Sequence, residues 1–126
     1  MPDNMQDKGG YYTRAIVNHA KRTQRVQCYE LASLYDFSWG NVVKYLWRWR
    51  GKNGVEDLNK ALDYAITADG NPTPYAYETV REIIYGLIEA GGMYGEETEA
   101  WLSILEENKS GTCAALERLI ARANNE

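Results

Sequence analysis

Residues 40–64 constrain the fold more than any other part of the chain, because they read as two amphipathic helices joined by a short basic turn. At about 100° per residue, the first segment places its large apolar side chains on one broad arc and its polar ones in a narrow sector opposite. A second apolar stripe of the same period runs over residues 55–68. Gly51 and Gly54 bracket the turn, which suits a helix end and a tight reversal. The pattern predicts an antiparallel helical hairpin, with Ser38 as the N-cap of its first helix.

Each predicted helix has an apolar face and a polar face. In the first helix the apolar arc holds Trp39, Val42, Val43, Leu46, Trp47 and Trp49, and the polar sector holds Asn41, Lys44 and Arg48. In the second helix the apolar face holds Val55, Leu58, Ala61, Leu62, Ala65 and Ile66, and the polar face holds Glu56, Lys60, Asp63 and Tyr64. We expect the three tryptophans to pack in the core or at a subunit interface.

The remaining segments also have helical patterns. Thr73 and Pro74 have the character of an N-cap and a first helical residue, and Gly91 follows the helix that they would open. Further helices are expected over 96–108 and 112–123, and no segment alternates with period two for long enough to predict a strand. We therefore predict an all-α fold, a compact bundle of five to six helices around the hairpin. Within one domain, residues 1–17 are expected to be a tail, 18–70 the hairpin region and 71–126 a C-terminal helical extension.

Composition limits the class of protein. A chain of 126 residues with 44% hydrophobic and 25% charged residues is ordinary for a soluble globular domain. No run approaches the ~18 apolar residues of a membrane span, and the N-terminus lacks the layout of a signal peptide, so we expect a cytoplasmic protein. Cys28 and Cys113 lie far apart without a second pair, which argues against a zinc site or a disulfide scaffold.

Charge is divided unevenly along the chain. Through Lys52 there are nine Lys and Arg against four Asp and Glu, and after it five against fourteen. Three explanations stay open: a basic site for a phosphate-bearing ligand in the N-terminal half, attraction between halves of neighbouring subunits, or solvated helix faces of uneven composition. The net charge of −4 argues against an extended nucleic-acid footprint.

The hairpin holds the best candidates for chemistry. Lys44 and Arg48 lie one turn apart, Arg50 and Lys52 lie at the turn, and Asn41 adds a neutral donor, a grouping suited to phosphate oxygens. Neighbouring residues extend this predicted site: Tyr45, Tyr64 and Lys60 on the polar faces, His19 as a base or phosphate contact, and Glu56, Asp57 and Asp63 as Mg²⁺ ligands.

Purely structural roles are the alternative for the same residues. Glu56 and Lys60 have the spacing of an i, i+4 ion pair, and Arg48 could bridge to Asp63 on the facing helix. His19 could equally be a capping or surface residue.

Several familiar sites are absent from the sequence. There is no GxxxxGK[ST] phosphate loop, no GxSxG elbow and no HExxH pair, and one histidine excludes a multi-histidine metal centre. All-helical pyrophosphatases hold Mg²⁺ with carboxylates three or four residues apart. Glu78 with Glu82, and Glu96 with Glu99, have that spacing, although an acidic segment produces such pairs easily.

The helical hairpin pattern resembles a small helical family of formally unknown function. That family is widespread in bacteriophage and prophage genomes and is described as nucleotide-kinase-like. The resemblance covers roughly residues 18–65. After its histidine the family usually has Tyr and Lys, whereas this chain has Ala20 and Lys21. The matching residues are His19, Gly40, Asn41, Lys44, Tyr45, Arg48, Gly51, Lys52, Glu56, Asp57, Leu58, Lys60, Ala61 and Tyr64.

The resemblance implies a phage or prophage nucleotide-binding protein, and more specifically a deoxynucleoside-monophosphate kinase that lacks a P-loop and uses Mg²⁺. The alternative is a non-catalytic phage effector that binds a host protein, nucleoprotein or nucleotide signal and blunts host defence. An effector surface would map to the acidic helices after Thr73. Because three tryptophans on one face are hard for a short chain to cover, we also expect a homo-oligomer.

Overall fold

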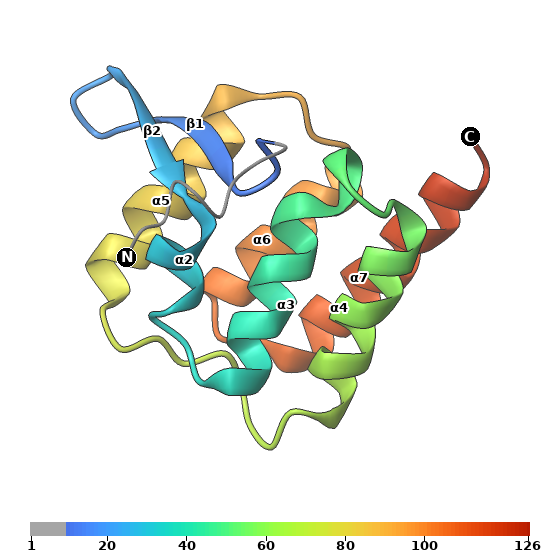
Figure 1. Ribbon diagram of the computed structural model, residues 1–126. Helices are drawn as coiled ribbons and strands as arrows, with labels where there is room; N and C mark the ends of the chain where they lie inside the picture. Colours follow the sequence, from blue (N-terminus) through green and yellow to red (C-terminus); the bar gives the residue numbers. More distant parts are fainter. Residues whose placement is uncertain (1–9) are drawn as a thin grey trace.

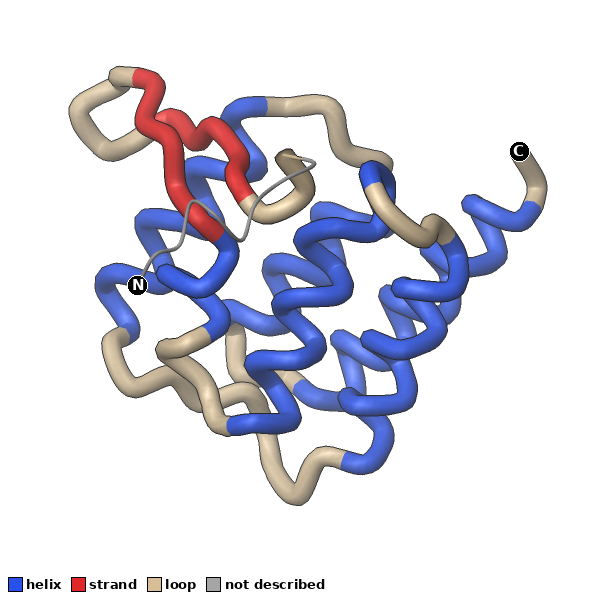
Figure 2. Tube along the Cα trace, viewed as in Figure 1, coloured by secondary structure: helices blue, strands red, loops and turns tan. Residues whose placement is uncertain are grey.

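The computed structural model describes residues 10–126, which begin with a β-hairpin. Strands β1 (Thr13–Val17) and β2 (Thr23–Gln27) are antiparallel, with Thr13 opposite Gln27 and Val17 opposite Thr23 (Figure 2). In the turn, the Asn18 side chain accepts hydrogen bonds from the backbone N–H groups of Ala20 and Arg22 at 2.9 and 3.1 Å. The expectation of an all-α fold is therefore wrong in this segment.

The hairpin escapes sequence patterns because it buries so little. Ile16 and Val26 are its buried residues, one in each strand, so no alternating apolar stripe forms. The predicted tail over 1–17 also differs from the structure, since Thr13–Val17 is a strand. Its first nine residues lie outside the described part of the chain.

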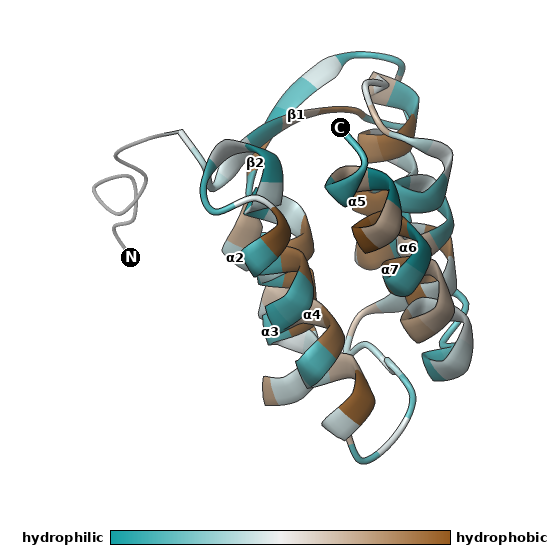
Figure 3. Ribbon diagram, turned by 90° about the vertical axis from the view of Figure 1, so that its right-hand side faces the viewer, coloured by the Kyte–Doolittle hydropathy of each residue, from teal (hydrophilic) through white to brown (hydrophobic). Residues whose placement is uncertain are grey.

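Six α-helices follow the hairpin in the described residues, and they form two layers. Figure 3 shows α2, α3 and α4 in one layer and α5, α6 and α7 in the other, and Figure 1 shows α3 and α4 side by side. The helix count agrees with the five to six predicted. The helices are α2 (Cys28–Ala32), α3 (Phe37–Arg48), α4 (Val55–Thr67), α5 (Tyr77–Ala90), α6 (Gly95–Leu105) and α7 (Lys109–Asn124), and a 3₁₀ turn, η1 (Trp49–Gly51), follows α3.

Two predicted helix starts are wrong. Asp36, not Ser38, is the N-cap of α3, and its carboxylate accepts from the Trp39 backbone N–H at 2.9 Å. Helix α5 begins at Tyr77, three residues after Pro74. The preceding segment is held as a loop because the Tyr75 backbone N–H donates to the Leu34 carbonyl at 2.7 Å.

The core lies between the two layers. The whole predicted apolar arc of the first helix is buried, and Trp39 is fully enclosed. Trp47 of α3 meets Trp101 of α6 edge to face, with ring centres 6.5 Å apart. The chain itself covers Trp39, Trp47 and Trp49, so they supply no open apolar face for a second copy. That argument for a homo-oligomer falls away, and oligomerisation stays a prediction.

The hairpin is fixed to α5 at one glycine. A Cβ atom at Gly86 would lie 2.8 Å from the Ile16 Cβ and 2.9 Å from the Val17 carbonyl oxygen. Only glycine allows this close approach of strand and helix. Strand β1 packs on α5 and α4 packs on α7, so the segments divided after residues 17 and 70 contact one another.

Candidate ligand-binding face

A buried ion pair lies at the junction of α3 and α4. Arg48 Nε and Nη2 donate to the two carboxylate oxygens of Asp57, each at 3.1 Å, and Arg48 Nη1 is hydrogen-bonded to the Tyr12 hydroxyl. Asn53 donates to the same carboxylate from its backbone and its side chain. Arg48 is 8% exposed and Asp57 is fully buried. Burial opposes the charge of Arg48, but the bonds to Asp57 and Tyr12 outweigh it and raise the pKa of this guanidinium.

This pair corrects two predictions about Arg48. Its donors do not point outward to a phosphate, and its partner is Asp57 rather than Asp63. The short turn brings the first turn of α4, where Asp57 lies, against the end of α3. Asp63 is nearly two turns further along α4 and is exposed. Arg48 is therefore committed to the fold by a bidentate contact.

Outside this pair, two stacked tyrosines and two lysines form a cluster, which we call the tyrosine platform: Tyr45 and Tyr64 with Lys44 and Lys60. The rings of Tyr45 and Tyr64 are stacked, with centres 6.1 Å apart and planes 14° apart. Lys44 Nζ lies 4.8 Å and Lys60 Nζ 5.5 Å from the centre of the Tyr45 ring. All four side chains are partly exposed, so the platform combines an accessible aromatic surface with two ammonium groups.

The fixed arginine supports this platform. The Arg48 guanidinium carbon lies 4.8 Å from the Tyr45 ring centre and 5.8 Å from that of Tyr12. Phe37, 76% exposed, meets the edge of Tyr64 with ring centres 6.0 Å apart. The structure thus brings together four predicted site residues, Lys44, Tyr45, Lys60 and Tyr64, and the buried pair contacts one of them, Tyr45.

Two other predicted residues contribute differently on this side. Asn41 uses its side-chain amide within its own helix, donating to the Phe37 carbonyl at 2.9 Å. Lys52, exposed in the turn, lies 5.7 Å from the ring centres of both Tyr11 and Tyr12. Lys52 therefore extends the basic side toward the hairpin, while Asn41 stabilises α3 locally.

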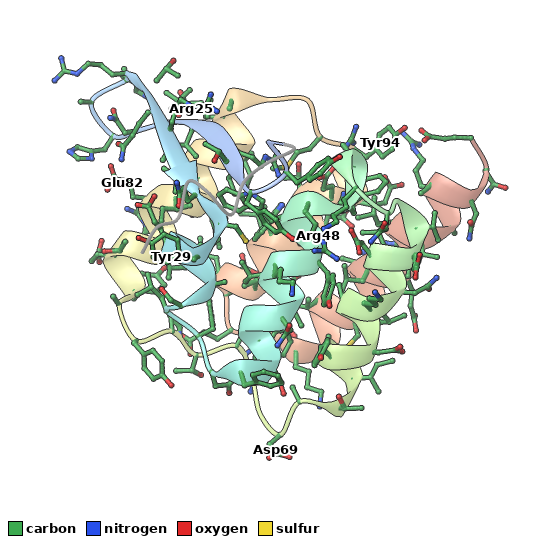
Figure 4. The ribbon with its side chains drawn as sticks, in the orientation of Figure 1. Arg25, Tyr29, Arg48, Asp69, Glu82 and Tyr94 are labelled. Atoms are coloured by element: carbon green, nitrogen blue, oxygen red, sulfur yellow. The ribbon has the colours of Figure 1, made fainter. Side chains whose placement is uncertain are left out.

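Arg50 and His19 point elsewhere. Arg50 donates to Glu97 of α6 at 2.9 Å. His19, in the hairpin turn, has Nδ1 2.7 Å from a carboxylate oxygen of Glu82 on α5, and this hydrogen bond lowers the pKa of Glu82. Figure 4 shows Glu82 near the hairpin turn and well apart from Arg48. The single predicted site is thus divided into separate places.

Two of the three predicted Mg²⁺ ligands, Glu56 and Asp57, have basic partners. Glu56 lies 4.0 Å from Lys60, which confirms the i, i+4 pair, and Asp57 is taken up by Arg48. Glu82 and Glu99 of the alternative pairs contact His19 and Arg118. Over residues 10–126 no group of three or more His, Cys, Asp or Glu could hold a metal ion. Mg²⁺ is often held by one or two carboxylates together with phosphate oxygens, so its binding here stays a prediction.

Sequence patterns missed the partners that come from the hairpin and from α6. Tyr12, Arg14 and Glu97 each contact or face residues of the α3–α4 turn, but all three lie outside the amphipathic stripes that drew attention to that turn. A carboxylate inside a helical apolar face was the one available signal for Glu97, which is 1% exposed.

The fold and this face define a mostly helical domain with a basic, aromatic surface on two adjacent helices. Residues 11–66 match a family of proteins of unknown function, DUF3310, and a domain of that family is found there. The match runs from the start of the hairpin into the last turn of α4, so it includes the tyrosine platform and the Arg48–Asp57 pair. No curated protein and no solved structure matches the chain. None of the helices within residues 10–126 has the length and apolar character needed to cross a membrane.

Proposed function

We propose that the protein binds a nucleotide, or another phosphate-bearing ligand with a flat ring, on the tyrosine platform. The observation that carries this is the placement of Lys44 and Lys60 beside the stacked rings of Tyr45 and Tyr64. An aromatic ring accepts a base by stacking, worth about 1–3 kcal/mol per base, and ammonium groups bind phosphate oxygens as point charges.

The contact of Arg48 with Tyr45 favours a binding site over a chance cluster of surface residues. Arg48 is fixed by hydrogen bonds to Asp57 and Tyr12 and lies against Tyr45, so the ring has a fixed neighbour before a ligand arrives. A ring that is already fixed loses less conformational entropy on binding. The platform is thus better prepared for a ligand than two freely moving surface tyrosines would be.

Calorimetric titration tests this proposal. The wild-type protein is titrated with deoxynucleoside mono- and triphosphates and with the parent nucleosides, with and without Mg²⁺. Lys44→Gln/Lys60→Gln is expected to weaken nucleotide binding at least 10-fold, and Tyr64→Leu to weaken nucleotides and nucleosides together. Lys21→Gln, an exposed lysine of the hairpin turn, is the matched charge control and is expected to change little. Equal losses in Lys21→Gln and the double variant would contradict the proposal.

Deoxynucleoside-monophosphate kinase activity is the more specific form of this proposal. Phosphoryl transfer depends chiefly on positioning and charge neutralisation, and Lys44 with Lys60 would neutralise phosphate charge here. A coupled assay of transfer from a deoxynucleoside triphosphate to a monophosphate measures it. Arg48→Ala is unsuitable as a catalytic variant, because it would leave Asp57 buried without its partner. Nucleotide binding without transfer would sink the kinase form and leave the binding proposal.

The alternative is a non-catalytic effector that binds a host protein. It is favoured by exposed tyrosines in and just before α5. Tyr75 is 75% exposed, Tyr77 is 44% exposed and Tyr85 is 45% exposed. Tyrosine is enriched among residues that dominate protein interfaces. An effector would keep its activity in Lys44→Gln/Lys60→Gln and lose it in Tyr75→Ser/Tyr77→Ser. We further propose that the protein is of phage or prophage origin, is cytoplasmic and forms a homo-oligomer. The family resemblance suggests the origin, and the sequence suggests the location and the oligomer.

A further inference from the structure

A pocket with basic side chains lies next to the α3–α4 turn. This pocket of about 280 Å³ lies where the hairpin, the end of α3 with η1, and α6 meet. Its walls combine aromatic rings with charged groups. The lining includes Tyr11, Arg14, Trp47, Trp49, Arg50 and Glu97.

Arg14 is the unexplained group in this pocket. It is partly buried, and its guanidinium carbon lies 5.7 Å from the centre of the Trp47 ring. Within the described part of the chain its guanidinium makes no hydrogen bond and no ion pair, although it carries donors on every nitrogen. Burial lowers the pKa of Arg14, Glu97 opposes this, and Arg50 adds to it. A charged fork that is partly removed from water without a partner is costly unless an acceptor joins it.

Arg50 is held in place at the wall of the same pocket. Glu97, 1% exposed, accepts from Arg50 Nη2 at 2.9 Å and from Trp49 Nε1 at 3.3 Å. The Arg50 guanidinium carbon also lies 4.9 Å from the Trp49 ring centre and 4.7 Å from that of Tyr94. Glu97 accepts from one nitrogen of Arg50 and so orients the guanidinium, while its other N–H groups stay available.

We propose that this pocket binds the phosphate group of a small phosphate monoester, between the guanidinium groups of Arg14 and Arg50. A carboxylate carries one negative charge on two oxygens, whereas a phosphate monoester carries up to two charges on three terminal oxygens and so matches two guanidinium groups better. The rings of Tyr11 and Trp49 border the space where the organic part of the ester would lie. Arg48 also lines this pocket, but none of the four platform residues does, and the proposal does not depend on the proposed function.

The test is a titration of the full chain with inorganic phosphate, phenyl phosphate and benzoate. Binding is followed by calorimetry and by the indole N–H signal of Trp49 in nuclear magnetic resonance spectra. The Trp39 indole N–H, which donates to the Gly70 carbonyl away from the pocket, is the internal reference. We expect phenyl phosphate to bind more tightly than inorganic phosphate and benzoate to bind at least 10-fold more weakly than phenyl phosphate. The Trp49 signal should shift while the Trp39 signal does not.

Variants separate this pocket from general charge and from the platform. Arg14→Gln and Arg50→Gln are each expected to weaken phenyl phosphate at least 10-fold. Arg25→Gln removes one charge from the exposed side of the neighbouring strand, and Lys44→Gln/Lys60→Gln removes two from the platform; each is expected to change the affinity less than 2-fold. Thermal melts show which variants are folded. If Arg14→Gln does not fold, the test rests on Arg50→Gln, because the Arg50 side chain is half-exposed.

Three results would overturn the proposal: no shift of the Trp49 signal at 20 mM phosphate or phenyl phosphate, equal weakening by Arg25→Gln and Arg50→Gln, or loss of phenyl phosphate binding only in Lys44→Gln/Lys60→Gln. The last result would assign phosphate binding to the platform and leave the proposed function standing. Loss of nucleotide binding to the platform with an intact Trp49 response would do the reverse.

Discussion

Two arginine–carboxylate pairs flank the α3–α4 turn, and they differ in what they leave unsatisfied. Arg48 and Asp57 are both buried. All three side-chain nitrogens of Arg48 donate to Asp57 or Tyr12, and Asn53 also donates to Asp57. Arg50 is 44% exposed, shares Glu97 with Trp49, and has the unpaired Arg14 as its neighbour in the pocket. Two arginines separated by one residue can therefore have opposite roles: one stabilises the fold, and the other is available to a ligand.

The largest expected effect comes from breaking the buried pair. Arg48→Met leaves the Asp57 carboxylate buried without its partner and is expected to lower the free energy of unfolding by about 3–5 kcal/mol. Urea denaturation followed by circular dichroism measures this. Replacing both partners, as Arg48→Met/Asp57→Leu, should recover a large part of the loss. A single variant as stable as the wild type would contradict the structural role assigned to Arg48.

The second pair is expected to tolerate the equivalent change better. Glu97→Gln keeps an acceptor for Trp49 and Arg50 but removes the charge, so the expected loss is about 1.5–3 kcal/mol, typical of a hydrogen bond to a charged group. The same denaturation experiment applies, with Asp57→Asn as the comparison. If Glu97→Gln proves more destabilising than Asp57→Asn, the ranking of the two pairs is wrong.

Both arginine pairs depend on the hairpin, which supplies Tyr12 to one and Arg14 to the other. Gly86→Ala would place a methyl group within 3 Å of β1 and push the hairpin away from α5. We expect a loss of about 1–3 kcal/mol, as for other overpacked sites. Gly95→Ala, also in a helix but with no atom within 4 Å of its added Cβ, is the control. Similar stabilities for the two variants would argue against this packing.

The smallest effect is expected at Tyr35, away from both pairs. Burial, aided by Glu107 and Tyr77, raises the pKa of Tyr35, and its hydroxyl has no partner in residues 10–126. The unfolded chain releases this proton near pH 10 while the folded chain retains it, so stability falls as the pH rises past about 10. Tyr35→Phe should stay within about 1 kcal/mol of wild type at pH 7 and lose less stability between pH 9 and 11. Parallel curves for the two proteins would refute this.

The helices were predictable because their apolar residues recur at the helical period over many positions. The burial of Trp39, Val43 and Leu46 follows directly from that pattern. Strands β1 and β2 were not predictable in this way, since each buries a single residue. Their pairing depends on contacts with α5 that no local pattern carries.

The candidate site was predictable only in part, for a similar reason. Lys44, Tyr45, Lys60 and Tyr64 share one face because helical spacing places them there. Arg48 belongs to the same stripe, but its direction is decided by where the turn places Asp57. The division between Arg48 and Arg50 depends on Glu97, which α6 brings to the turn through the tertiary fold.

We propose that the lysines and tyrosines of the platform, rather than Arg48, contact a nucleotide. The most direct measurement is one calorimetric titration with the tightest-binding deoxynucleotide, run on wild type, Lys44→Gln/Lys60→Gln and Arg48→Met/Asp57→Leu. We predict at least a 10-fold loss of affinity in the lysine variant at an unchanged melting temperature, and less than a 3-fold loss in the folded Arg48→Met/Asp57→Leu protein. Unchanged affinity in the lysine variant, or complete loss confined to the folded arginine variant, would contradict the claim.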